Sequence, residues 1–330
     1  MKLSAPEALL PKHRLEGFTC GEPALDEWLP RRTRANTTAE SPGLRQGRYT
    51  RSIMSAWSSI AGPLLFAHRG ASVERPENTL PAFELGLELG ADVLELDVHP
   101  SRDGVFVVLH DATGSRMCGV ERALSDCDWS EIAGWDAGFG FIDRDGQRSM
   151  AGRGIHPSRF DDVLDALPGA LFNVDVKDAR EPELRKLLAL LRARGAEPRV
   201  LLTSFLAEVL GSVRRLGYAG PLGLSQRDVV RLVFTPAFVT RRFPFAGSRA
   251  QIPTRSGPLD LTRPGLLDKC RALGLALDYW VINEPEEARL LLQRGADGII
   301  TDDTRALVQV FASAPQTSAW RARHARVETA

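Results

Sequence analysis

Short apolar runs that stop at polar or charged residues recur along the chain. Each run has the length of a buried β-strand, and each is followed by residues that favour loops or helix starts. The first three runs cover residues 64–67, 93–98 and 105–109. We expect all three to be strands, with the polar residues that follow them at the strands' carboxyl ends.

A helix is predicted after the first run. Apolar residues recur at helical spacing from residue 80 to residue 91, and Asn78 and Thr79 are suited to cap the helix start. His68 directly follows the first run and begins the loop before this helix. The segment therefore predicts a strand-loop-helix unit with His68 at the carboxyl end of its strand.

The same alternation continues through most of the chain. Further strands are predicted at residues 171–176, 199–204, 222–225, 250–254, 276–282 and 298–301, and helices at residues 182–193, 206–216, 264–273 and 286–293. Together with the strands at residues 64–67 and 93–98, this pattern predicts an α/β fold, a (β/α)8 TIM barrel. Residues 226–250 are the exception, and they form either a loop over the site or a surface segment.

Three segments lie outside the repeat. Residues 112–158 are a small insertion between the second strand and a helix near residues 159–167, and residues 316–330 are a C-terminal tail. Residues 1–60 read as an N-terminal appendage and linker, ahead of the barrel at residues 61–315. Within the appendage, LEGFTCG and LDEWL resemble the start of acetyltransferase-type toxins. No acetyl-CoA-binding part follows, so we expect a remnant without function.

Candidate chemistry gathers at the strand ends. Glu95 and Asp97 lie two residues apart on one predicted strand, so their side chains project from the same face. The run at residues 105–109 leads into His110 in the way that the first run leads into His68. Because the active sites of (β/α)8 barrels lie at the carboxyl ends of the strands, we expect these side chains to converge there with Asp175.

These residues carry a family resemblance. HRG at residues 68–70, PENT at 76–79, ELD at 95–97 and HD at 110–111 resemble motifs of the glycerophosphodiester phosphodiesterase family. The later motifs NVDVK, TSF, YWVIN and DGIITD follow in the family's order, so that the resemblance covers roughly residues 62–312. It implies a metal-dependent hydrolase that releases glycerol 3-phosphate and an alcohol from glycerophosphodiesters, in glycerophospholipid catabolism.

The resemblance also suggests roles for individual residues. His68 and His110 are the predicted general acid-base pair, because an imidazole exchanges protons near neutral pH. Arg69 and Lys177 are predicted to bind the substrate phosphate, although Lys177 is equally suited to an ion pair with Asp175. Two further candidates for substrate contact are Asn78, which also suits a helix cap, and Trp280, which also suits the barrel core.

A divalent cation is the predicted cofactor. Two carboxylates about 4 Å apart repel each other by about 4 kcal/mol at an effective dielectric constant near 20, so Glu95, Asp97 and Asp175 need protons or a cation between them. An oxygen-only ligand set favours Mg²⁺ or Ca²⁺ over zinc. The alternative is that these acids form structural ion pairs with arginines. Asp175 also departs from the family's usual glutamate, which leaves the choice of metal open.

Composition restricts partners and location. The chain has 42 basic and 42 acidic residues, so we expect a small-molecule substrate rather than nucleic acid or an anionic membrane. It has no apolar run near the roughly 20 residues of a membrane span and no apolar signal-peptide region, and we expect a cytoplasmic protein without membrane insertion. Its four cysteines lack CxxC spacing and are expected to be reduced thiols. Oligomeric state cannot be predicted.

Two other functions are compatible with the same residues. A phospholipase D-like or lysophospholipid-cleaving barrel would use the same histidines and acids, and a wide apolar rim above the site would favour it over a glycerophosphodiesterase. A non-catalytic barrel that binds a phosphodiester is the second alternative. Its support is the aspartate at position 175, because both candidate catalytic histidines are present.

Overall fold

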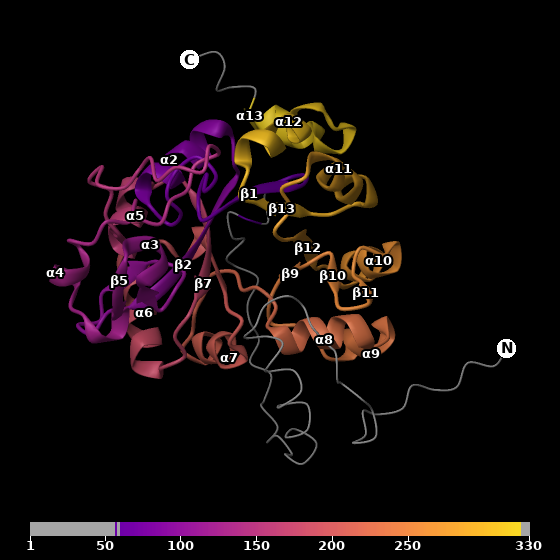
Figure 1. Cartoon of the computed structure of the whole chain (residues 1–330). Helices are drawn as coiled ribbons and strands as arrows, with labels where there is room; N and C mark the ends of the chain where they lie inside the picture. Colours follow the sequence, from indigo (N-terminus) through magenta and orange to yellow (C-terminus); the bar gives the residue numbers. More distant parts are fainter. Residues whose placement is uncertain (1–56, 58–59, 325–330) are drawn as a thin grey trace.

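The computed structural model describes residue 57 and residues 60–324, and a ring of parallel strands surrounded by helices forms its centre (Figure 1). The toxin-like segment and Cys20 lie outside the described residues, as does the end of the C-terminal tail. The strands of the ring are β1 (Leu64–His68), β2 (Val93–Pro100), β7 (Leu171–Val176), β8 (Val200–Thr203), β9 (Arg249–Ile252), β12 (Ala276–Tyr279) and β13 (Gly298–Thr301).

The ring closes where its first and last strands meet. β1 pairs in parallel with β2 and with β13, and further parallel pairs lead from β2 through β7 to β8 and from β13 through β12 to β9. Between β8 and β9, the strand predicted at residues 222–225 is reduced to single parallel bridges from Leu222 to Leu202 and from Gly223 to Arg249. The predicted (β/α)8 fold class is confirmed, with this one strand shorter than expected.

Close backbone packing explains the short strand. A Cβ atom on Gly223 would lie 2.7 Å from the side chain of Thr203, and one on Gly247 would lie 2.2 Å from the carbonyl oxygen of Gly223. Only glycine allows this approach, and glycine in a strand interior weakens the strand. The sequence pattern at residues 222–225 thus marks a ring position without a regular strand.

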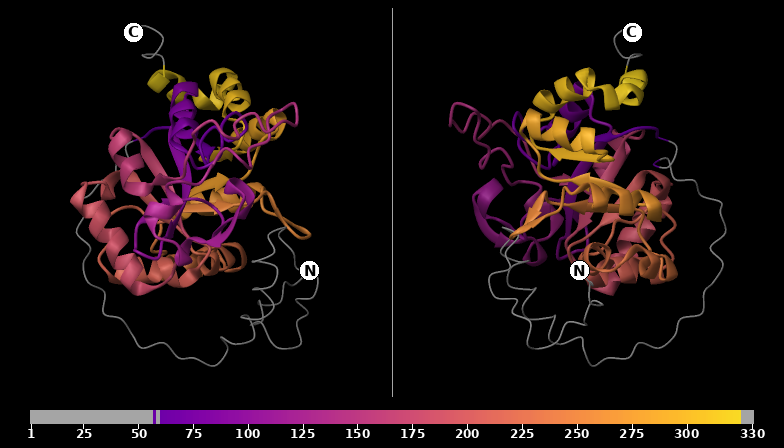
Figure 2. Two further views of the ribbon diagram at one scale, coloured as in Figure 1. Left: turned by 60° about the vertical axis from the view of Figure 1, so that its left-hand side comes forward. Right: turned by 90° about the vertical axis from the view of Figure 1, so that its right-hand side faces the viewer.

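Helices follow most strands of the ring and cover its outside (Figure 2). The four helices predicted at residues 182–193, 206–216, 264–273 and 286–293 are found to within one residue at each end. Two helices occupy the segment left open at residues 226–250, where Phe243 is 62% exposed, so this segment is a surface element. The main helices are α2 (Leu80–Leu89), α5 (Phe160–Ala166), α6 (Glu181–Ala193), α7 (Ala207–Arg215), α8 (Gln226–Phe234), α9 (Ala237–Arg242), α10 (Pro264–Leu273), α11 (Pro285–Arg294), α12 (Thr304–Ser313) and α13 (Ser318–His324).

The insertion is a small folded unit beside β2. β3 (Phe106–Val108) pairs antiparallel with β2, and it is the third predicted strand, which lies outside the parallel ring. Met117, Leu124 and Trp135 belong to an apolar cluster of the insertion's own. The other short elements are β4 (Thr113–Gly114), α3 (Ser115–Cys118), β5 (Val120–Ala123), α4 (Trp129–Ile132) and β6 (Ser158–Arg159) in this region, and the hairpin β10 (Arg255–Ser256) and β11 (Leu259–Asp260) after β9.

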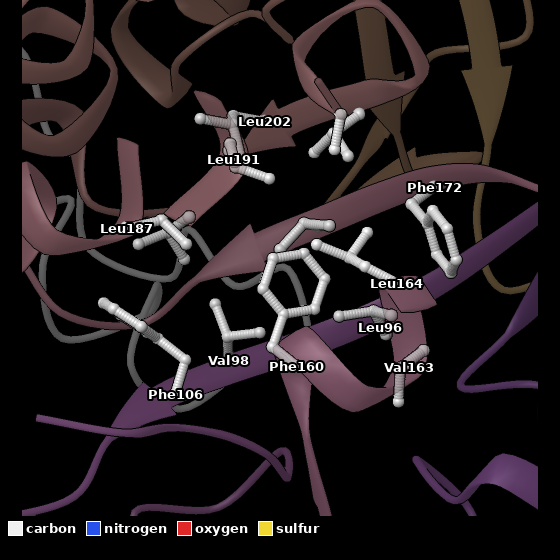
Figure 3. Packing of buried hydrophobic residues seen from close by; sticks show 14 of the residues in the cluster. Leu96, Val98, Phe106, Phe160, Val163, Leu164, Phe172, Leu187, Leu191 and Leu202 are labelled. Carbon is white, nitrogen blue, oxygen red and sulfur yellow. The ribbon is translucent and has the colours of Figure 1, made fainter. Parts of the chain in front are cut away.

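The apolar core determines which way the strand residues face. Leu94, Leu96 and Val98 of β2 are fully buried in a cluster with residues of α5, α6 and α7, and Figure 3 shows Phe160 of α5 packed beside Leu96 and Val98. Burying each such side chain contributes about 1.5–3 kcal/mol. Since alternate residues of a strand point to opposite faces, this packing directs Glu95 and Asp97 into the ring.

No helix within residue 57 and residues 60–324 combines the length and the apolar character needed to cross a membrane.

Candidate active site

Three buried carboxylates lie at the carboxyl ends of adjacent strands. Asp97 on β2 is paired in register with Asp175 on β7, and Glu95 is paired with His68 on β1. The relative exposures of Glu95, Asp97 and Asp175 are 7%, 2% and 6%. The convergence of the acids and His68 that the strand pattern predicts is therefore present.

His68 lies between two carboxylates. Its Nδ1 is 2.6 Å from Oδ1 of Asp302, and its Nε2 is 3.8 Å from Oε2 of Glu95. Burial alone would lower the pKa of His68, but the charge of Glu95 and the hydrogen bond with Asp302 outweigh burial and raise it. The Asp302 contact holds the ring in one orientation, with Nε2 facing the interior of the site.

Asp302 was not among the predicted site residues. It directly follows β13, and Nδ2 of Asn283 donates to its Oδ2 at 2.9 Å. Both residues belong to motifs of the family resemblance and stand at the ends of ring strands, the same signal that marked His68. The position of Asp302 beside His68, however, depends on the pairing of β1 with β13.

Two cations of the chain hold the acids. Nζ of Lys177 is 2.7 Å from Oδ2 of Asp175 and 3.0 Å from Oδ1 of Asp97. Nε of Arg69 is 3.3 Å from Oδ2 of Asp97, and its backbone N–H donates to Glu95 at 3.1 Å. The ion pair of Lys177 with Asp175, one of its two predicted roles, is thus present.

The loop after β1 has an unusual backbone that aims Arg69. Arg69 has a φ of 58°, a left-handed conformation that costs a non-glycine residue on the order of 1 kcal/mol. The next residue, Gly70, has a φ of 85°, and a Cβ there would lie 2.6 Å from the backbone of Ala82 in α2. The HRG motif therefore provides the tight turn from which the Arg69 side chain contacts Asp97 inside the ring.

The charged neighbours separate the pKa values of the three acids. Burial and repulsion by Asp97 raise the pKa of Glu95 to about 7. Burial also favours a raised pKa at Asp97, but Lys177, Arg69 and His110 outweigh it and hold that pKa well below the usual range. Burial raises the pKa of Asp175 despite its contact with Lys177. Glu95 and Asp175 consequently carry a proton more readily than Asp97 does.

His110 reaches the site from the strand that precedes the insertion. Its Nδ1 lies 2.7 Å from Oδ1 of Asp111, and its carbonyl oxygen accepts a hydrogen bond from Nε2 of His99 at 2.9 Å. His110 is among the charges that lower the pKa of Asp97, so it belongs to the same group of side chains. Asp111 and His99 were not predicted to take part, although Asp111 follows His110 directly and His99 lies on β2, which pairs with β3.

Asn78 positions an acid instead of capping a helix. It is 1% exposed, its Nδ2 donates to Oδ2 of Asp97 at 2.9 Å, and its Oδ1 accepts from the Asp97 backbone at 3.3 Å. The N-cap of α2 is Thr79, whose side chain makes no cap hydrogen bond and donates instead to the carbonyl oxygen of Pro76. The predicted side-chain cap is therefore wrong, because the Asn78 side chain bonds to Asp97 and the Thr79 side chain bonds to Pro76.

Apolar side chains line one side of the mouth. Phe205 is 45% exposed, its ring lies edge-on to Trp280 with centroids 5.9 Å apart, and it lies 5.8 Å from Nζ of Lys177. Trp280 is half-buried and also packs on an inner apolar cluster that contains Phe66. Trp280 thus combines a core contact with a place at the rim, and Phe205, one residue beyond Ser204 in the TSF motif, was not predicted.

The donor chemistry of the site suits a hard cation, but its side chains are arranged around Lys177 and Arg69. Among the residues that the structure describes, no three His, Cys, Asp or Glu side chains are close enough together to enclose a metal ion. Oδ1 of Asp175 is nevertheless buried without a hydrogen-bond partner, and Glu95 ionises only near neutral pH. An unpartnered carboxylate oxygen beside two further buried acids has the oxygen-donor chemistry that Mg²⁺ and Ca²⁺ prefer.

Comparisons with known proteins identify the family to which the chain is similar. A sequence profile described as "Glycerophosphoryl diester phosphodiesterase family" matches residues 68–306. The chain is 30% identical over 252 residues to "Glycerophosphodiester phosphodiesterase" of Caldanaerobacter subterraneus subsp. tengcongensis, which covers 75% of this chain and 97% of that protein. It is 28% identical over 262 residues to human "Lysophospholipase D GDPD1", which covers 72% and 82%.

A solved structure shares the fold. An Oleispira antarctica phosphodiesterase in complex with the product sn-glycerol-3-phosphate matches with a TM-score of 0.61 at 21% identity, over 76% of this chain and 98% of that one.

Proposed function

The chain belongs to the glycerophosphoryl diester phosphodiesterase family, and from this membership we propose that it hydrolyses glycerophosphodiesters to glycerol 3-phosphate and an alcohol. The observation that carries the proposal is the meeting of His68, three buried carboxylates and two cations at the carboxyl ends of β1, β2 and β7. The proposed substrate is a small molecule, as in the related phosphodiesterase structure with glycerol 3-phosphate.

The phosphate is proposed to bind beside Arg69 and Lys177. Both side chains are less than one-fifth exposed, and the pKa of each is raised because the neighbouring carboxylates outweigh burial, so both remain cationic. Preorganised cations of this kind stabilise the charge that develops on phosphoryl oxygens in the transition state.

One divalent cation, Mg²⁺ or Ca²⁺, is proposed to be held by Glu95, Asp97 and Asp175. When bound, such an ion supplies Lewis acidity at a phosphoryl oxygen. The site calls for added positive charge once Glu95 is ionised, because its six carboxylates then outnumber its five cationic groups even when both histidines are protonated, and a phosphodiester adds another negative charge. The carboxylates are Glu77, Glu95, Asp97, Asp111, Asp175 and Asp302, and the permanent cations are Arg69, Arg116 and Lys177.

The two histidines are proposed to transfer the protons. Each has a carboxylate on Nδ1, Asp302 for His68 and Asp111 for His110, which leaves Nε2 of each ring for the substrate. One imidazole takes the proton of the attacking hydroxyl, and the other gives a proton to the leaving alkoxide. The attacking hydroxyl belongs either to water or to the substrate's glycerol, and the resemblance to the family favours the glycerol, which would form a cyclic phosphate first.

A lysophospholipid substrate is the second candidate. Phe205, 45% exposed, packs edge-on to Trp280 at the mouth and offers an apolar surface for an acyl chain, and the next residue, Leu206, is 40% exposed. The relationship to a human protein named lysophospholipase D supports this candidate. Both candidates share the same phosphodiester chemistry and differ in the group that packs on this apolar side.

The deciding experiment measures release of glycerol 3-phosphate from glycerophosphocholine and glycerophosphoethanolamine, with Mg²⁺, Ca²⁺ or a chelator. We expect turnover that requires the ion and is lost in His68→Ala but retained in His156→Ala, whose histidine contacts the Trp135 carbonyl in the insertion. Turnover of lysophosphatidylcholine alone would favour the second candidate. Binding of glycerophosphocholine without turnover under any condition would favour a non-catalytic barrel.

A cytoplasmic location stays a prediction. It is supported by Cys118, Cys127 and Cys270, which are buried free thiols in the part of the chain that the structure describes.

A further inference from the structure

Arg116 of the insertion joins two carboxylates at the edge of the site. Its Nη2 donates to Oε1 of Glu77 at 2.7 Å, its Nη1 donates to Oε2 of Glu77 at 2.9 Å, and its Nε donates to Oδ2 of Asp111 at 2.6 Å. Three nitrogens of one guanidinium thus hold two acids from different loops.

Each of these carboxylates also contacts a residue of the candidate site. Oε1 of Glu77 accepts from Nη1 of Arg69 at 3.0 Å, and Oδ1 of Asp111 lies 2.7 Å from Nδ1 of His110. A continuous chain of contacts therefore runs from Arg69 through Glu77, Arg116 and Asp111 to His110. It connects the proposed phosphate-binding arginine with one of the two proposed acid-base histidines.

We propose that Arg116 is a positioning residue, which orients Arg69 and His110 together through Glu77 and Asp111. The inference rests on the proposed phosphodiesterase function, since it assigns Arg116 a part in that reaction. Arg116 itself is not proposed to touch the substrate.

Packing of the insertion fixes the backbone position of Arg116. The neighbouring Met117 and Cys118 of α3 are buried in the insertion's apolar cluster, with 4% and 5% exposure. A Cβ on Gly140 would lie 2.2 Å from the carbonyl oxygen of Arg116, so the loop at Gly140 packs closely against α3. The insertion therefore fixes the backbone from which the Arg116 side chain reaches Glu77 and Asp111.

The Arg116 contacts differ from an ordinary surface ion pair because their acceptors are carboxylates that also contact residues of the site. Arg122, in the same insertion, is as exposed as Arg116, at 47% of its side chain, but it pairs with Glu131, a residue 40% exposed and outside the site. Glu77, by contrast, is only 15% exposed, and Arg116 and Arg69 together outweigh the effect of its burial and lower its pKa. Arg122 is accordingly a matched control for Arg116.

Arginine is required for this role because its planar fork carries donors toward both acids at once. A lysine has a single ammonium group on a flexible stem and does not reproduce a bidentate contact with Glu77. Loss of residues that orient a functional group from behind typically reduces activity or affinity by about 10–100-fold. We expect Arg116→Ala to lower kcat/KM for glycerophosphocholine in that range, and Arg116→Lys to recover only part of the loss.

The test uses the full chain with Arg116→Ala, Arg116→Lys and Arg122→Ala. Three quantities are measured: steady-state turnover of glycerophosphocholine with Mg²⁺, the affinity for glycerol 3-phosphate by calorimetry, and the long-range ¹H–¹⁵N NMR signals of the His110 ring, with the thermal midpoint as a check of folding. We expect Arg116→Ala to lose turnover and glycerol 3-phosphate affinity and to shift the His110 signals, with a thermal midpoint equal to that of Arg122→Ala.

Several outcomes would overturn the proposal. Turnover and affinity within about twofold of wild type, unmoved His110 signals, or losses shared by Arg122→Ala would each remove the positioning role. A thermal midpoint that is lowered in Arg116→Ala alone would show that Arg116 stabilises the fold and would not support a positioning role. If the wild-type chain turns over no glycerophosphodiester, the proposed function fails, and the NMR and calorimetric measurements still decide whether Arg116 orients His110 and Arg69.

Discussion

His68 and Asp302 lie 234 positions apart in the chain, yet Nδ1 of His68 is 2.6 Å from Oδ1 of Asp302. The contact exists because β1 and β13 are neighbours in the closed ring, and each residue stands at the carboxyl end of its strand. Closure of the barrel thus places a carboxylate behind the proposed catalytic histidine. The pairing of β1 with β13 therefore helps to raise the pKa of His68, because it brings Asp302 to that imidazole ring.

Replacement of Asp302 by Asn should lower kcat strongly and leave KM nearly unchanged. The amide keeps the size of the carboxylate, but it no longer stabilises a protonated His68 and no longer selects one ring tautomer. By analogy with other carboxylate-histidine pairs, we expect a loss on the order of 10²–10⁴-fold in kcat. The measurement is steady-state turnover of glycerophosphocholine at saturating Mg²⁺.

Asp303→Asn is the matched control for this prediction. Asp303 is the next residue, and its side chain caps α12 by accepting from the backbone of Ala306, a role that asparagine also fills. Its turnover should stay within about threefold of wild type. A similar kcat for the two variants would show that the Asp302 contact has no part in catalysis.

The elevated pKa of Glu95, about 7 against an ordinary value of 4.5, predicts a pH-dependent stability. Between these two pH values the folded protein binds more protons at Glu95 than the unfolded chain does, so the free energy of unfolding decreases as the pH rises. The shift corresponds to about 3 kcal/mol. In urea titrations with a chelator, wild type should lose about this much more stability than Glu95→Gln between pH 4.5 and 7.5.

Two controls accompany that measurement. Glu88→Gln alters an exposed glutamate of α2 and should keep the wild-type pH dependence. Added Mg²⁺ should reduce the decrease in wild type, because a cation favours ionised Glu95. Parallel pH dependences for wild type and Glu95→Gln would contradict the elevated pKa.

Local patterns predicted the ring and the inward acids. The runs at residues 64–67, 93–98 and 171–176 are β1, β2 and β7, and the two-residue spacing of Glu95 and Asp97 put both side chains on one face. These features depend on alternation along a single strand and on burial of its apolar face. A short stretch of sequence contains both kinds of information.

Other parts of the site depend on contacts between distant segments. The partnership of His68 with Asp302 arises from the pairing of β1 and β13, and that of Arg116 with Glu77 arises from the docking of the insertion on the loop after β1. The shortening of the strand at residues 222–225 follows from the close approach of Gly223 and Gly247. No periodicity of polar and apolar residues encodes such approaches.

Asp175 should decide how tightly the proposed cation binds. Its Oδ1 is buried and has no hydrogen-bond partner, while Oδ2 is held by Lys177. Asp175→Asn removes the charge and keeps the shape, so we expect the Mg²⁺ concentration for half-maximal activity to rise by at least about tenfold. Calorimetric titration of Mg²⁺ without substrate should show the same loss.

Two control variants accompany the Asp175 prediction. Asp178→Asn alters a carboxylate that pairs with Arg180 near the same strand end, and its Mg²⁺ dependence should match that of wild type. Asp175→Glu introduces the residue usual in the family and should retain binding. Unchanged Mg²⁺ affinity in Asp175→Asn would exclude Asp175 as a ligand.

Phe205 should distinguish the two substrate classes. Its exposed ring packs edge-on to Trp280 beside Lys177, where the non-phosphate part of a substrate would lie. Transferring an acyl chain from water to this surface is favourable by about 25 cal/mol per Å² of apolar area, and a serine removes much of that area. We therefore expect Phe205→Ser to lower kcat/KM for lysophosphatidylcholine by about tenfold and for glycerophosphocholine by less than about threefold. Phe234→Ser, at a phenylalanine 61% exposed at the end of α8, is the control and should change neither. Equal losses for both substrates would mean that Phe205 orders the mouth for the shared phosphodiester, and the apolar rim would then carry no preference for lipids.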